Sequence, residues 1–490
     1  MKSIPVTLTT PDFTRKIYVK SREEYDFWKQ VGKYILKVKT LPSTMYVEAK
    51  IDGKVYNAEM HLMHRGDVAL PDGTKVPSLH INSAFSNILL DENKKYEEME
   101  LRCINTSGNN YKKYFLEPRP DGIYGRYGGI DIPKDQCRVI KNPYERWLFW
   151  PLYYEKLSKG YKDVTDITMS GTAVTKTSSS RKRTSRSGMT VNERMYAQFY
   201  EYAHGVVKKN LVSEIVTQEQ VDKSEAILDK MRRCRKVETF NKQYEELMLL
   251  SPRKRDWKTD KIGDYLAKSK DDFPKILDFE ENLITAMQGV VIATQHRESF
   301  KDYNIHFWEA TDTQKQEVMG LIEQPSIRSM VKHVYRVKPE KQEKALSAYC
   351  KKNGVKEKRK FFHGTVNGNM LSLIINGPDI ARTAANGRMW GDAFYTAKSA
   401  HKSWNYTSCR GTSWARGTES KGYLLIYTCA YGNPYKPSTR GGKHYSQSYL
   451  RSMGYHCVHA EAARTGLRAD EIMFYDKDAV CLSYVVELAC

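Results

Sequence analysis

The sequence has no long apolar run, and this absence argues against a protein with membrane-spanning helices. Its longest apolar stretches, such as Leu424–Tyr427, are far shorter than the roughly 18–20 residues that a membrane-spanning helix needs. The first residues, MKSIPVTLTTPDF, contain no apolar core of the kind that a secretory signal carries. We therefore expect an intracellular protein without membrane segments.

Cysteine is also sparse and scattered. The nine cysteines are an odd number, and no two are separated by the two to four residues that bring together the ligands of a structural zinc site. A zinc finger or zinc ribbon is therefore excluded, and we expect no metal. The simplest interpretation is that all nine are free thiols in a reducing compartment.

What the sequence does contain is many apolar and aromatic residues and an excess of positive charge. Apolar residues make up 40% of the 490 residues, which is enough for packed cores and, at this length, for about three or four domains. The formal net charge is +21. Such an excess attracts polyanions, of which nucleic acid is the commonest inside cells. A basic protein without a nucleic-acid partner is the alternative that charge alone leaves open.

A segment rich in Ser and Thr, residues 166–190, divides the chain. It has almost no large apolar residues and includes the basic cluster RKRTSR at 181–186, which is the composition of a solvated linker. Before it the pattern is that of strands, and Met45–Ile51 and Lys54–Met60 flank an Asp-Gly pair that predicts a hairpin. Two further strands and one helix are expected: Lys112–Leu116, Gly122–Tyr127, and a helix with Trp147, Trp150, Tyr154 and Leu157.

Helices dominate from the linker to about residue 290. Thr217 with Gln220 has the spacing of a capping box, and Val216 with Val221 forms the hydrophobic staple around it. The two helices that follow show apolar residues at three- and four-residue spacing, which predicts a helical bundle. The expected core-facing residues are Phe240, Tyr244, Leu247 and Met248 in one helix and Ile276, Phe279, Leu283 and Met287 in the next.

Strands return beyond residue 300, with short helices between them. The clearest are Val331–Val337, Gly422–Ala430 and Asp478–Leu488. We therefore expect a multidomain α+β protein. It would have a β-rich N-terminal region, an all-α helical bundle and an α+β domain at the C-terminus.

The C-terminal third contains four segments in a distinctive order. The first is FFHGT at 361–365 with NMLSLIING at 369–377, and the second is GRMWGDAFY at 387–395 with KSWNY at 402–406. Then follow LLIYTCAYGNPY from residue 424 and DEIMFYD from residue 470. In this order they resemble the catalytic domain of the poly(ADP-ribose) polymerases, which implies an ADP-ribosyltransferase fold that uses NAD⁺ as a substrate.

The resemblance implies how the nicotinamide end of NAD⁺ binds. The backbone of Gly364 and the hydroxyl of Ser403 would hold the carboxamide. Tyr395 and Tyr406 would stack on the two faces of the ring, where each aromatic pair contributes roughly 0.5–1.5 kcal/mol. Lys402 belongs to the same motif and is also expected to contact NAD⁺.

The resemblance also assigns His363, Tyr395 and Glu471 as the catalytic residues. His363 would hydrogen-bond the adenosine ribose, while Glu471 would bind the 2″-hydroxyl and act as a general base toward the acceptor hydroxyl. Loss of nicotinamide leaves an oxocarbenium-like ribose, which a carboxylate stabilises. In the family, glutamate at this position is associated with chain elongation, so Glu471 permits polymer formation without proving it.

Two features depart from the family. A Pro-Asp pair at 378–379 stands where Leu-Arg is common, which leaves Arg382 or Arg388 to replace the arginine near the adenosine or pyrophosphate. The segment before Glu471 is short, although GKH at 442–444 resembles the start of the family's acceptor loop. Acceptor choice and chain length therefore stay open.

Residues 98–165 resemble the WGR domain, a module for DNA ends and interdomain contacts in DNA-dependent members of the family. The supporting motifs are NYKKYF at 110–115 and YGRYGG at 124–129, with tyrosine in place of the tryptophan that names the domain. Aromatic faces stack on nucleotides, and guanidinium groups bind phosphates. The resemblance implies DNA contacts by Lys112, Tyr124 and Arg126.

The helices after the linker resemble the regulatory helical domain of the same enzymes, which blocks access of NAD⁺ until DNA binds. A scaffold without a regulatory role is the alternative. The expected division is a β-rich module of unknown role at 1–97, the WGR-like domain at 98–165, the linker at 166–190, the helical domain at 191–298 and the catalytic domain at 299–490.

We therefore expect an NAD⁺-dependent poly-ADP-ribosyltransferase that is activated by DNA breaks or ends and releases nicotinamide. Its acceptors would be itself, other proteins or nucleic acid. The alternatives are a mono-ADP-ribosyltransferase of one specific target and a catalytically inactive scaffold that binds DNA ends. In a eukaryote the expected location is the nucleus. Otherwise it is the cytoplasm, in association with the nucleoid.

Overall fold

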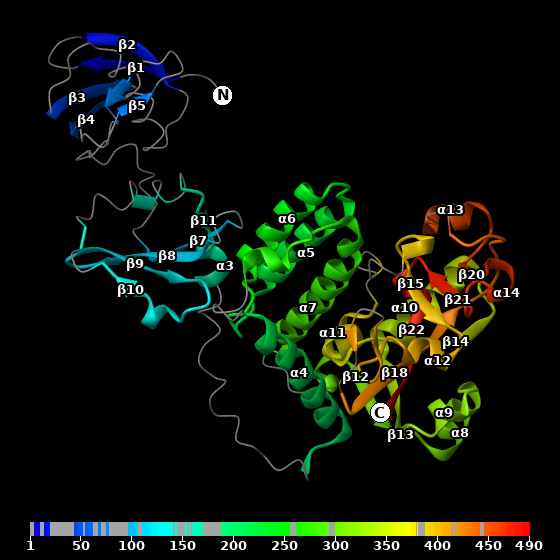
Figure 1. The fold of residues 1–490 in the computed structure, drawn as a ribbon. Helices are drawn as coiled ribbons and strands as arrows, with labels where there is room; N and C mark the ends of the chain where they lie inside the picture. The colour runs from blue at the N-terminus through cyan, green and yellow to red at the C-terminus, as the bar shows by residue number, and fades with distance from the viewer. Residues whose placement is uncertain are drawn as a thin grey trace. The chain divides into compact units, whose positions relative to one another are not determined.

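The structure, a computed structural model, divides into two compact units (Figure 1). One comprises Met1–Ile104 and Asn110–Thr165, and the other Asn105–Asn109 and Asp166–Cys490. The described residues are 4–9, 14–19, 44–51, 54–61, 67–69, 75–77, 97–105, 110–140, 143–144, 152–153, 156, 159–169, 188–254, 261–293, 299–378, 380, 388–412, 415–416, 419–441 and 445–490.

The first unit opens with a four-stranded antiparallel sheet in the order β2-β1-β3-β4. Ile51 pairs with Lys54, so the predicted hairpin is confirmed, and both of its strands are one residue longer than expected. A separate two-stranded ribbon follows. The strands are β1 (Ile4–Thr9), β2 (Thr14–Val19), β3 (Thr44–Ile51), β4 (Lys54–His61), β5 (Asp67–Ala69) and β6 (Lys75–Pro77).

A five-stranded sheet in the order β10-β9-β8-β7-β11 completes the first unit. One face packs on a small core of Leu101, Tyr114, Leu116 and Ile123. The two predicted strands are confirmed and are longer than expected, whereas the helix predicted around Trp147 lies almost wholly outside the described residues. The elements are β7 (Met99–Asn105), β8 (Asn110–Arg119), β9 (Gly122–Gly129), η1 (Lys134–Gln136), β10 (Arg138–Val139), β11 (Lys162–Asp163) and α3 (Thr165–Met169).

Four long helices begin the second unit and pack together. The side chain of Thr217 caps α5 as predicted, but Gln220 donates to the carbonyl of Leu250 and the hydroxyl of Ser251 instead of closing the capping box. A complete box begins α4, where Thr190 and Glu193 cap each other. The elements are α4 (Val191–Asn210), α5 (Gln218–Arg233), α6 (Val237–Leu250), η5 (Ile262–Tyr265), η6 (Lys270–Asp272) and α7 (Phe273–Ala293).

The predicted core stripe of α7 is correct for Leu283 and Met287 but wrong for Phe279. The Phe279 side chain is 44% exposed, because the helix turns Leu277 and Glu280 inward at that level. Glu280 is fully buried, and its charge is matched by an ion pair with Arg253. The apolar pattern alone predicts that Phe279 is buried at this level of the helix, because the pattern gives no reason to bury Glu280 in its place.

A nine-stranded mixed sheet forms the body of the C-terminal domain, in the order β12-β13-β22-β18-β14-β15-β21-β20-β19. This confirms the α+β class of the C-terminal domain, and the predicted strands shift by only one or two residues at their ends. The strands are β12 (Ile305–Glu309), β13 (Val331–Pro339), β14 (Lys358–Gly364), β15 (Phe394–Ala397), β18 (Lys421–Ala430), β19 (Pro434–Tyr435), β20 (Cys457–Ala460), β21 (Glu471–Phe474) and β22 (Val480–Ala489).

Short helices connect these strands, and a small hairpin of β16 (Gly411–Thr412) and β17 (Ala415–Arg416) stands apart from the sheet. Within the described part of the chain, no helix is long and apolar enough to cross a membrane. The connecting helices are η7 (Phe300–Tyr303), α8 (Asp312–Leu321), α9 (Pro325–Arg328), α10 (Glu340–Asn353), η8 (Asn367–Asn369), α11 (Met370–Asn376), η9 (Arg388–Trp390), α12 (Ala400–Trp404), α13 (Gln447–Ser452), α14 (Ala462–Thr465) and η10 (Lys477–Ala479).

The helices and the sheet share a hydrophobic core. Phe199 of α4 packs edge-on against Tyr423 of β18, with ring centroids 5.0 Å apart. The buried Asn192 side chain bonds both the N–H and the carbonyl of Phe307, so α4 is also tied to the sheet edge. Helix α7 lies against α11 of the C-terminal domain (Figure 1). The helical part is therefore built into the same unit as the nine-stranded sheet.

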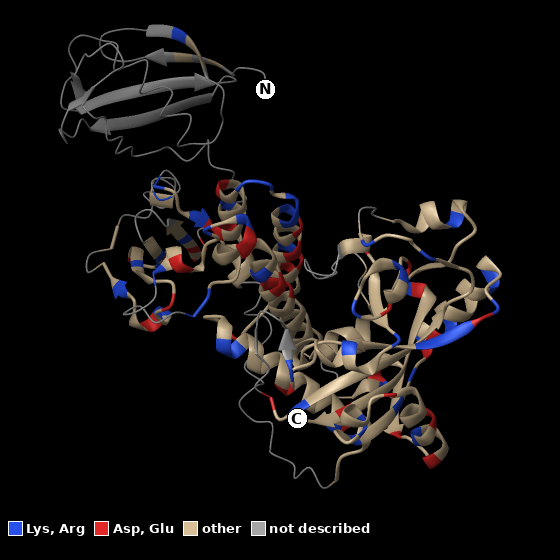
Figure 2. Ribbon diagram, turned by 45° about the vertical axis from the view of Figure 1, so that its right-hand side comes forward, with Lys and Arg blue, Asp and Glu red and all other residues tan. Residues whose placement is uncertain are grey.

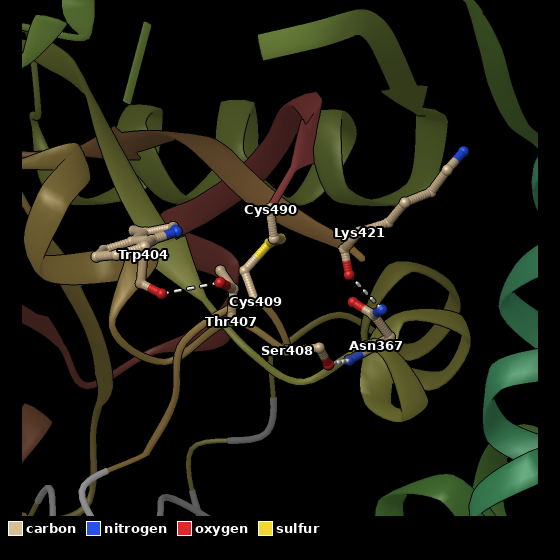
Figure 3. The surroundings of a disulfide bond; sticks show 7 residues. All are labelled: Asn367, Trp404, Thr407, Ser408, Cys409, Lys421 and Cys490. Atoms are coloured by element: carbon tan, nitrogen blue, oxygen red, sulfur yellow. Dashed lines mark hydrogen bonds between the residues drawn. A yellow bond between two sulfur atoms is a disulfide. The ribbon is translucent and has the colours of Figure 1, made fainter. Parts of the chain in front are cut away.

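A disulfide joins Cys409 and Cys490 (Figure 3). Their Cα atoms are 5.4 Å apart, within the usual range for a disulfide. Residue 409 follows α12, and the pairing of β18 with β22 brings the end of β22 beside it. The expectation of nine free thiols is therefore wrong for this pair, because sequence spacing does not reveal a contact across 81 residues.

Candidate active site

Three neighbouring strands of the large sheet carry the three predicted catalytic residues. His363 lies on β14, Tyr395 on β15 and Glu471 at the start of β21, and these strands are adjacent. Ala397 pairs with Glu471, and residues two apart in a strand share a face. Tyr395 and Glu471 therefore project from the same face of the sheet.

His363 is held in one tautomer. Its Nδ1 lies 2.9 Å from the carbonyl oxygen of Tyr395. A carbonyl can only accept, so Nδ1 carries the hydrogen and Nε2 is left as an acceptor. Burial against Phe394 and its neighbours lowers the pKa of His363 to about 4, although the bond to the Tyr395 carbonyl opposes this shift. The imidazole is therefore neutral near pH 7 and offers an acceptor to a hydroxyl.

The end of β14 touches α12 through the backbone at Gly364. A Cβ atom at this position would lie 1.8 Å from the carbonyl oxygen of Ser403, so only glycine fits. Ser403 is buried, and Tyr406 follows it with 49% of its side chain exposed. The predicted carboxamide-binding pair is thus brought together, with the predicted stacking tyrosine beside it.

Glu471 receives a hydrogen bond on each carboxylate oxygen. The Lys402 ammonium donates to Oε1, and the indole Nε1 of Trp390 donates to Oε2 over 3.3 Å. The side chains of Lys402 and Glu471 are only about one-fifth exposed, so this ion pair is partly shielded from solvent. The carboxylate is held by donors from two different segments, α12 and η9.

These residues line one cavity of about 1380 Å³. This exceeds the roughly 300–1,000 Å³ of a pocket for a drug-sized molecule, so an extended ligand such as a dinucleotide fits. The lining includes seven residues predicted to contact NAD⁺ or to catalyse: His363, Gly364, Tyr395, Lys402, Ser403, Tyr406 and Glu471.

Helix α7 forms another wall of this cavity. Asp278, Asn282 and Gln288 of α7 line it, together with Gln218 of α5. Burial raises the pKa of Asp278. Partial burial, and then the carboxylates of Glu471 and Asp278, raise the pKa of Tyr406. Asp278 and Tyr406 line the same cavity.

Arg382, the predicted adenosine-side arginine, lies outside the described residues. Its alternative, Arg388, begins η9. Two basic residues that sequence reasoning missed, Arg468 and Lys477, line the cavity with Lys402. Their positive charges suit the pyrophosphate of a dinucleotide.

In the first unit the three predicted DNA contacts do not lie together. Alternation along β8 and β9 places Tyr124 and Arg126 on one face of the ladder and the exposed Lys112 on the other. The Arg126 guanidinium is bound to Glu117 and to the carbonyl of Lys134. It is thus occupied inside the domain, rather than presented as a free phosphate fork.

The same face carries basic residues that the sequence motifs did not single out. Arg119 stacks over the ring of Tyr124 at 4.3 Å, and Lys134 lies over Phe115 at 5.1 Å. Figure 2 shows Lys and Arg along the strands and loops of this sheet. The register of β8 with β9 was needed to find this cluster, because sequence order separates its members.

Two features of the active site were also missed. Trp390 belongs to the GRMWGDAFY motif at 387–395, but nothing in the sequence indicates that its indole faces Glu471. The polar wall of α7 left a clearer signal, since its cavity-lining polar residues, Asp278, Glu281, Asn282, Thr285 and Gln288, recur at helical spacing.

Comparison with protein families supports the interpretation of the C-terminal domain. Residues 316–489 match the model of the poly(ADP-ribose) polymerase catalytic domain. The matched range includes every described residue that lines the cavity on the sheet side, from His363 to Lys477. No curated protein matches the chain.

Proposed function

We propose that this chain, whose residues 316–489 are a poly(ADP-ribose) polymerase catalytic domain and which is therefore an NAD⁺ ADP-ribosyltransferase, builds ADP-ribose polymers when it meets broken DNA. The observation that carries the proposal is the cavity itself. One wall holds the predicted NAD⁺-binding and catalytic residues, and the other is helix α7 of the helical part. An active site with such a wall is suited to control from outside.

NAD⁺ is proposed to bind with its nicotinamide against the junction of β14 and α12. Gly364 and Ser403 meet there, so a carboxamide could bond a backbone group and a hydroxyl together. Tyr395 and Tyr406 would stack on the ring. The neutral His363 supports the assignment at the other end, since its Nε2 can accept from an adenosine ribose hydroxyl.

Glu471 is proposed to act on the ribose that joins nicotinamide. The glycosidic bond between C1″ and the nicotinamide nitrogen breaks, and the Glu471 carboxylate faces the positive charge that develops. The acceptor oxygen then bonds to C1″ as Glu471 takes the proton of the acceptor hydroxyl. A positioned base of this kind contributes about 10²–10⁴-fold. When the acceptor is an ADP-ribose already attached, the same step lengthens a polymer.

Helix α7 is proposed to restrict this site until DNA binds. Asp278 brings negative charge to the cavity wall, where it opposes the pyrophosphate of NAD⁺, whereas Glu281 beside it is paired with Arg232. Loosening of α7 would remove this charge from the cavity wall, and DNA is the proposed trigger.

The five-stranded sheet is the proposed contact for DNA ends. Its face with Arg119, Tyr124 and Lys134 combines an aromatic ring with basic groups, which is the pattern of a nucleic-acid surface. The net charge of +21 supports the same partner. Acceptor proteins, including the chain itself, and a nuclear or nucleoid location belong to the same proposal.

Incubation with labelled NAD⁺, with and without nicked DNA, tests this function. We expect long ladders of label on the protein only when DNA is present. A single discrete band that does not depend on DNA would support a mono-ADP-ribosyltransferase instead. Absence of label under both conditions would support an inactive scaffold and contradict the proposal.

A further inference from the structure

Trp390 has the largest fully buried side chain among the described residues and stands 81 residues before the carboxylate that it contacts. Its indole Nε1 donates to Oε2 of Glu471 over 3.3 Å. Indole nitrogen is a donor only, and buried tryptophan normally needs an acceptor for it. In this fold the acceptor is the proposed catalytic base itself.

The backbone of Trp390 is fixed from several sides. Its N–H donates to the hydroxyl of Tyr395 over 3.1 Å, and its carbonyl accepts from the hydroxyl of Tyr475 over 2.5 Å. The N–H of Tyr445 donates to the same carbonyl over 3.3 Å. Burial raises the pKa of Tyr475, so this phenol stays protonated as a donor. The indole therefore has little freedom to leave Glu471.

The two donors on Glu471 differ in stiffness. Lys402 reaches Oε1 with a flexible four-carbon chain, whose ammonium can rotate and follow the carboxylate. Trp390 reaches Oε2 from a rigid ring packed in the core. A carboxylate held by the lysine alone can still turn about its terminal bond, whereas the second donor fixes the plane of both oxygens.

We propose that Trp390 is a positioning residue for Glu471, fixing the orientation of its carboxylate toward the reacting ribose through the indole N–H. This rests on the proposed role of Glu471 in ADP-ribosyl transfer. Because a misplaced base acts mainly on the chemical step, its loss lowers kcat and leaves the KM for NAD⁺ nearly unchanged. Packing of a large apolar ring at this place would not require an N–H.

The test removes the N–H and keeps the shape. Site-specific incorporation of β-(3-benzothienyl)alanine at position 390 replaces the indole nitrogen with sulfur, and Trp390→Phe serves as a second variant made from natural residues. We expect each to lower kcat by about tenfold, which is 1.36 kcal/mol of transition-state stabilisation, with the KM for NAD⁺ within about twofold of wild type.

The matched control is the same benzothienyl replacement at Trp404. The Nε1 of Trp404 is buried and has no hydrogen-bond partner in the described part of the structure, so the replacement should leave kcat and the melting temperature unchanged. A double-mutant cycle with Glu471→Gln completes the design, because the loss caused by either Trp390 variant should largely disappear when the carboxylate is absent.

The outcomes separate this proposal from the proposed function. If Glu471→Gln is fully active, the proposed role of Glu471 fails and the positioning role fails with it. If Glu471→Gln lowers kcat strongly but leaves a measurable residual rate, and the benzothienyl variant at 390 keeps wild-type kcat, only the positioning role is overturned. A loss of kcat that is equal with and without the Glu471→Gln substitution, together with a lower melting temperature, would show a packing role and would also overturn it.

Discussion

His363 shows how one residue sets both a site and a pH dependence. Its pKa is about 4 in the folded chain, because burial disfavours the charged ring, whereas an exposed histidine titrates near 6.5. Between pH 4 and pH 6.5, His363 is mostly protonated in the unfolded chain and mostly neutral in the folded chain. The contribution of neutral His363 to the free energy of unfolding is therefore fully present above pH 6.5 and is lost as the pH falls toward 4.

Replacing His363 with Gln removes this pH dependence. As the pH falls from 6.5 to 4, we expect the wild type to lose up to roughly 3 kcal/mol more of its unfolding free energy than His363→Gln loses. Urea denaturation at a series of pH values from 7.5 downward measures it. A difference that stays constant with pH would contradict a neutral, buried His363.

Gly364 is required by a contact, not by its backbone angles. A methyl group there would overlap the carbonyl oxygen of Ser403, and backbone cannot move aside cheaply. We expect Gly364→Ala to weaken binding of NAD⁺ by at least about tenfold, because it separates β14 from α12. Isothermal titration with a non-hydrolysable NAD⁺ analogue measures this loss.

Gly320 of α8 is the control for that substitution. A Cβ on Gly320 would meet nothing within 4 Å, and alanine is the better helix former by about 0.5–1 kcal/mol. Gly320→Ala should therefore raise stability and leave NAD⁺ binding unchanged. Unchanged binding in Gly364→Ala as well would mean that the junction with Ser403 does not hold the nicotinamide.

The family resemblance, carried by residue types and their order, predicted a set of residues that the structure brings to one cavity, but it did not predict their hydrogen-bond partners. His363, Tyr395 and Glu471 fall on adjacent strands because the motifs mark strand ends and starts. The bond from Trp390 to Glu471 depends on how η9 is tied to Tyr395 and Tyr475, which no local pattern encodes. The occupied guanidinium of Arg126 depends in the same way on strand register.

At the scale of elements, α7 is the piece with two roles. One side packs in the bundle, where the buried Glu280 bonds Arg253 and accepts from the hydroxyl of Tyr244 over 2.9 Å. Another side lines the cavity with Asp278 and Asn282. A buried ion pair thus holds the helix that the proposed function requires to move.

Breaking this ion pair should loosen α7. Arg253→Met leaves the Glu280 carboxylate buried without its cation, which we expect to cost about 3–5 kcal/mol of unfolding free energy. Under the proposed function it should also raise the consumption of NAD⁺ without DNA. Chemical denaturation and a nicotinamide-release assay measure the two effects.

Lys223→Met is the matched control, because it breaks the exposed pair of Lys223 with Glu219 on α5. We expect it to change stability by no more than about 0.5 kcal/mol and to leave the basal activity unchanged. If Arg253→Met were as mild as this control, the buried pair would not be what secures α7. Loss of stability without a rise in basal activity would contradict the gating role.

Periodicity predicted most of these elements and failed where tertiary contacts overrode it. The stripe of α6 was correct at Phe240 and Tyr244, since the helix has one neighbour-facing side. In α7 the same rule placed Phe279 in the core and missed Glu280, because burial of that carboxylate depends on Arg253 from another segment. Only half of the capping box at Thr217 formed, for a similar reason.

At the scale of the whole molecule, composition predicted a multidomain basic protein, and motif order predicted where the catalytic domain lies. Neither composition nor motif order could predict that the helical part and the catalytic sheet share a core, as they do through α4 and β18. Nor could they predict the link between Cys409 and Cys490, which depends on how β18 pairs with β22. Both features follow from long-range topology rather than from local sequence.

The measurement that tests the account most directly compares the wild-type chain with Glu471→Gln, using labelled NAD⁺ and nicked DNA. The account predicts DNA-dependent ladders from the wild type, and no elongation from Glu471→Gln, although the variant still binds an NAD⁺ analogue within about threefold of wild type. Ladders of wild-type length from Glu471→Gln would contradict the role of Glu471 and, with it, the central claim.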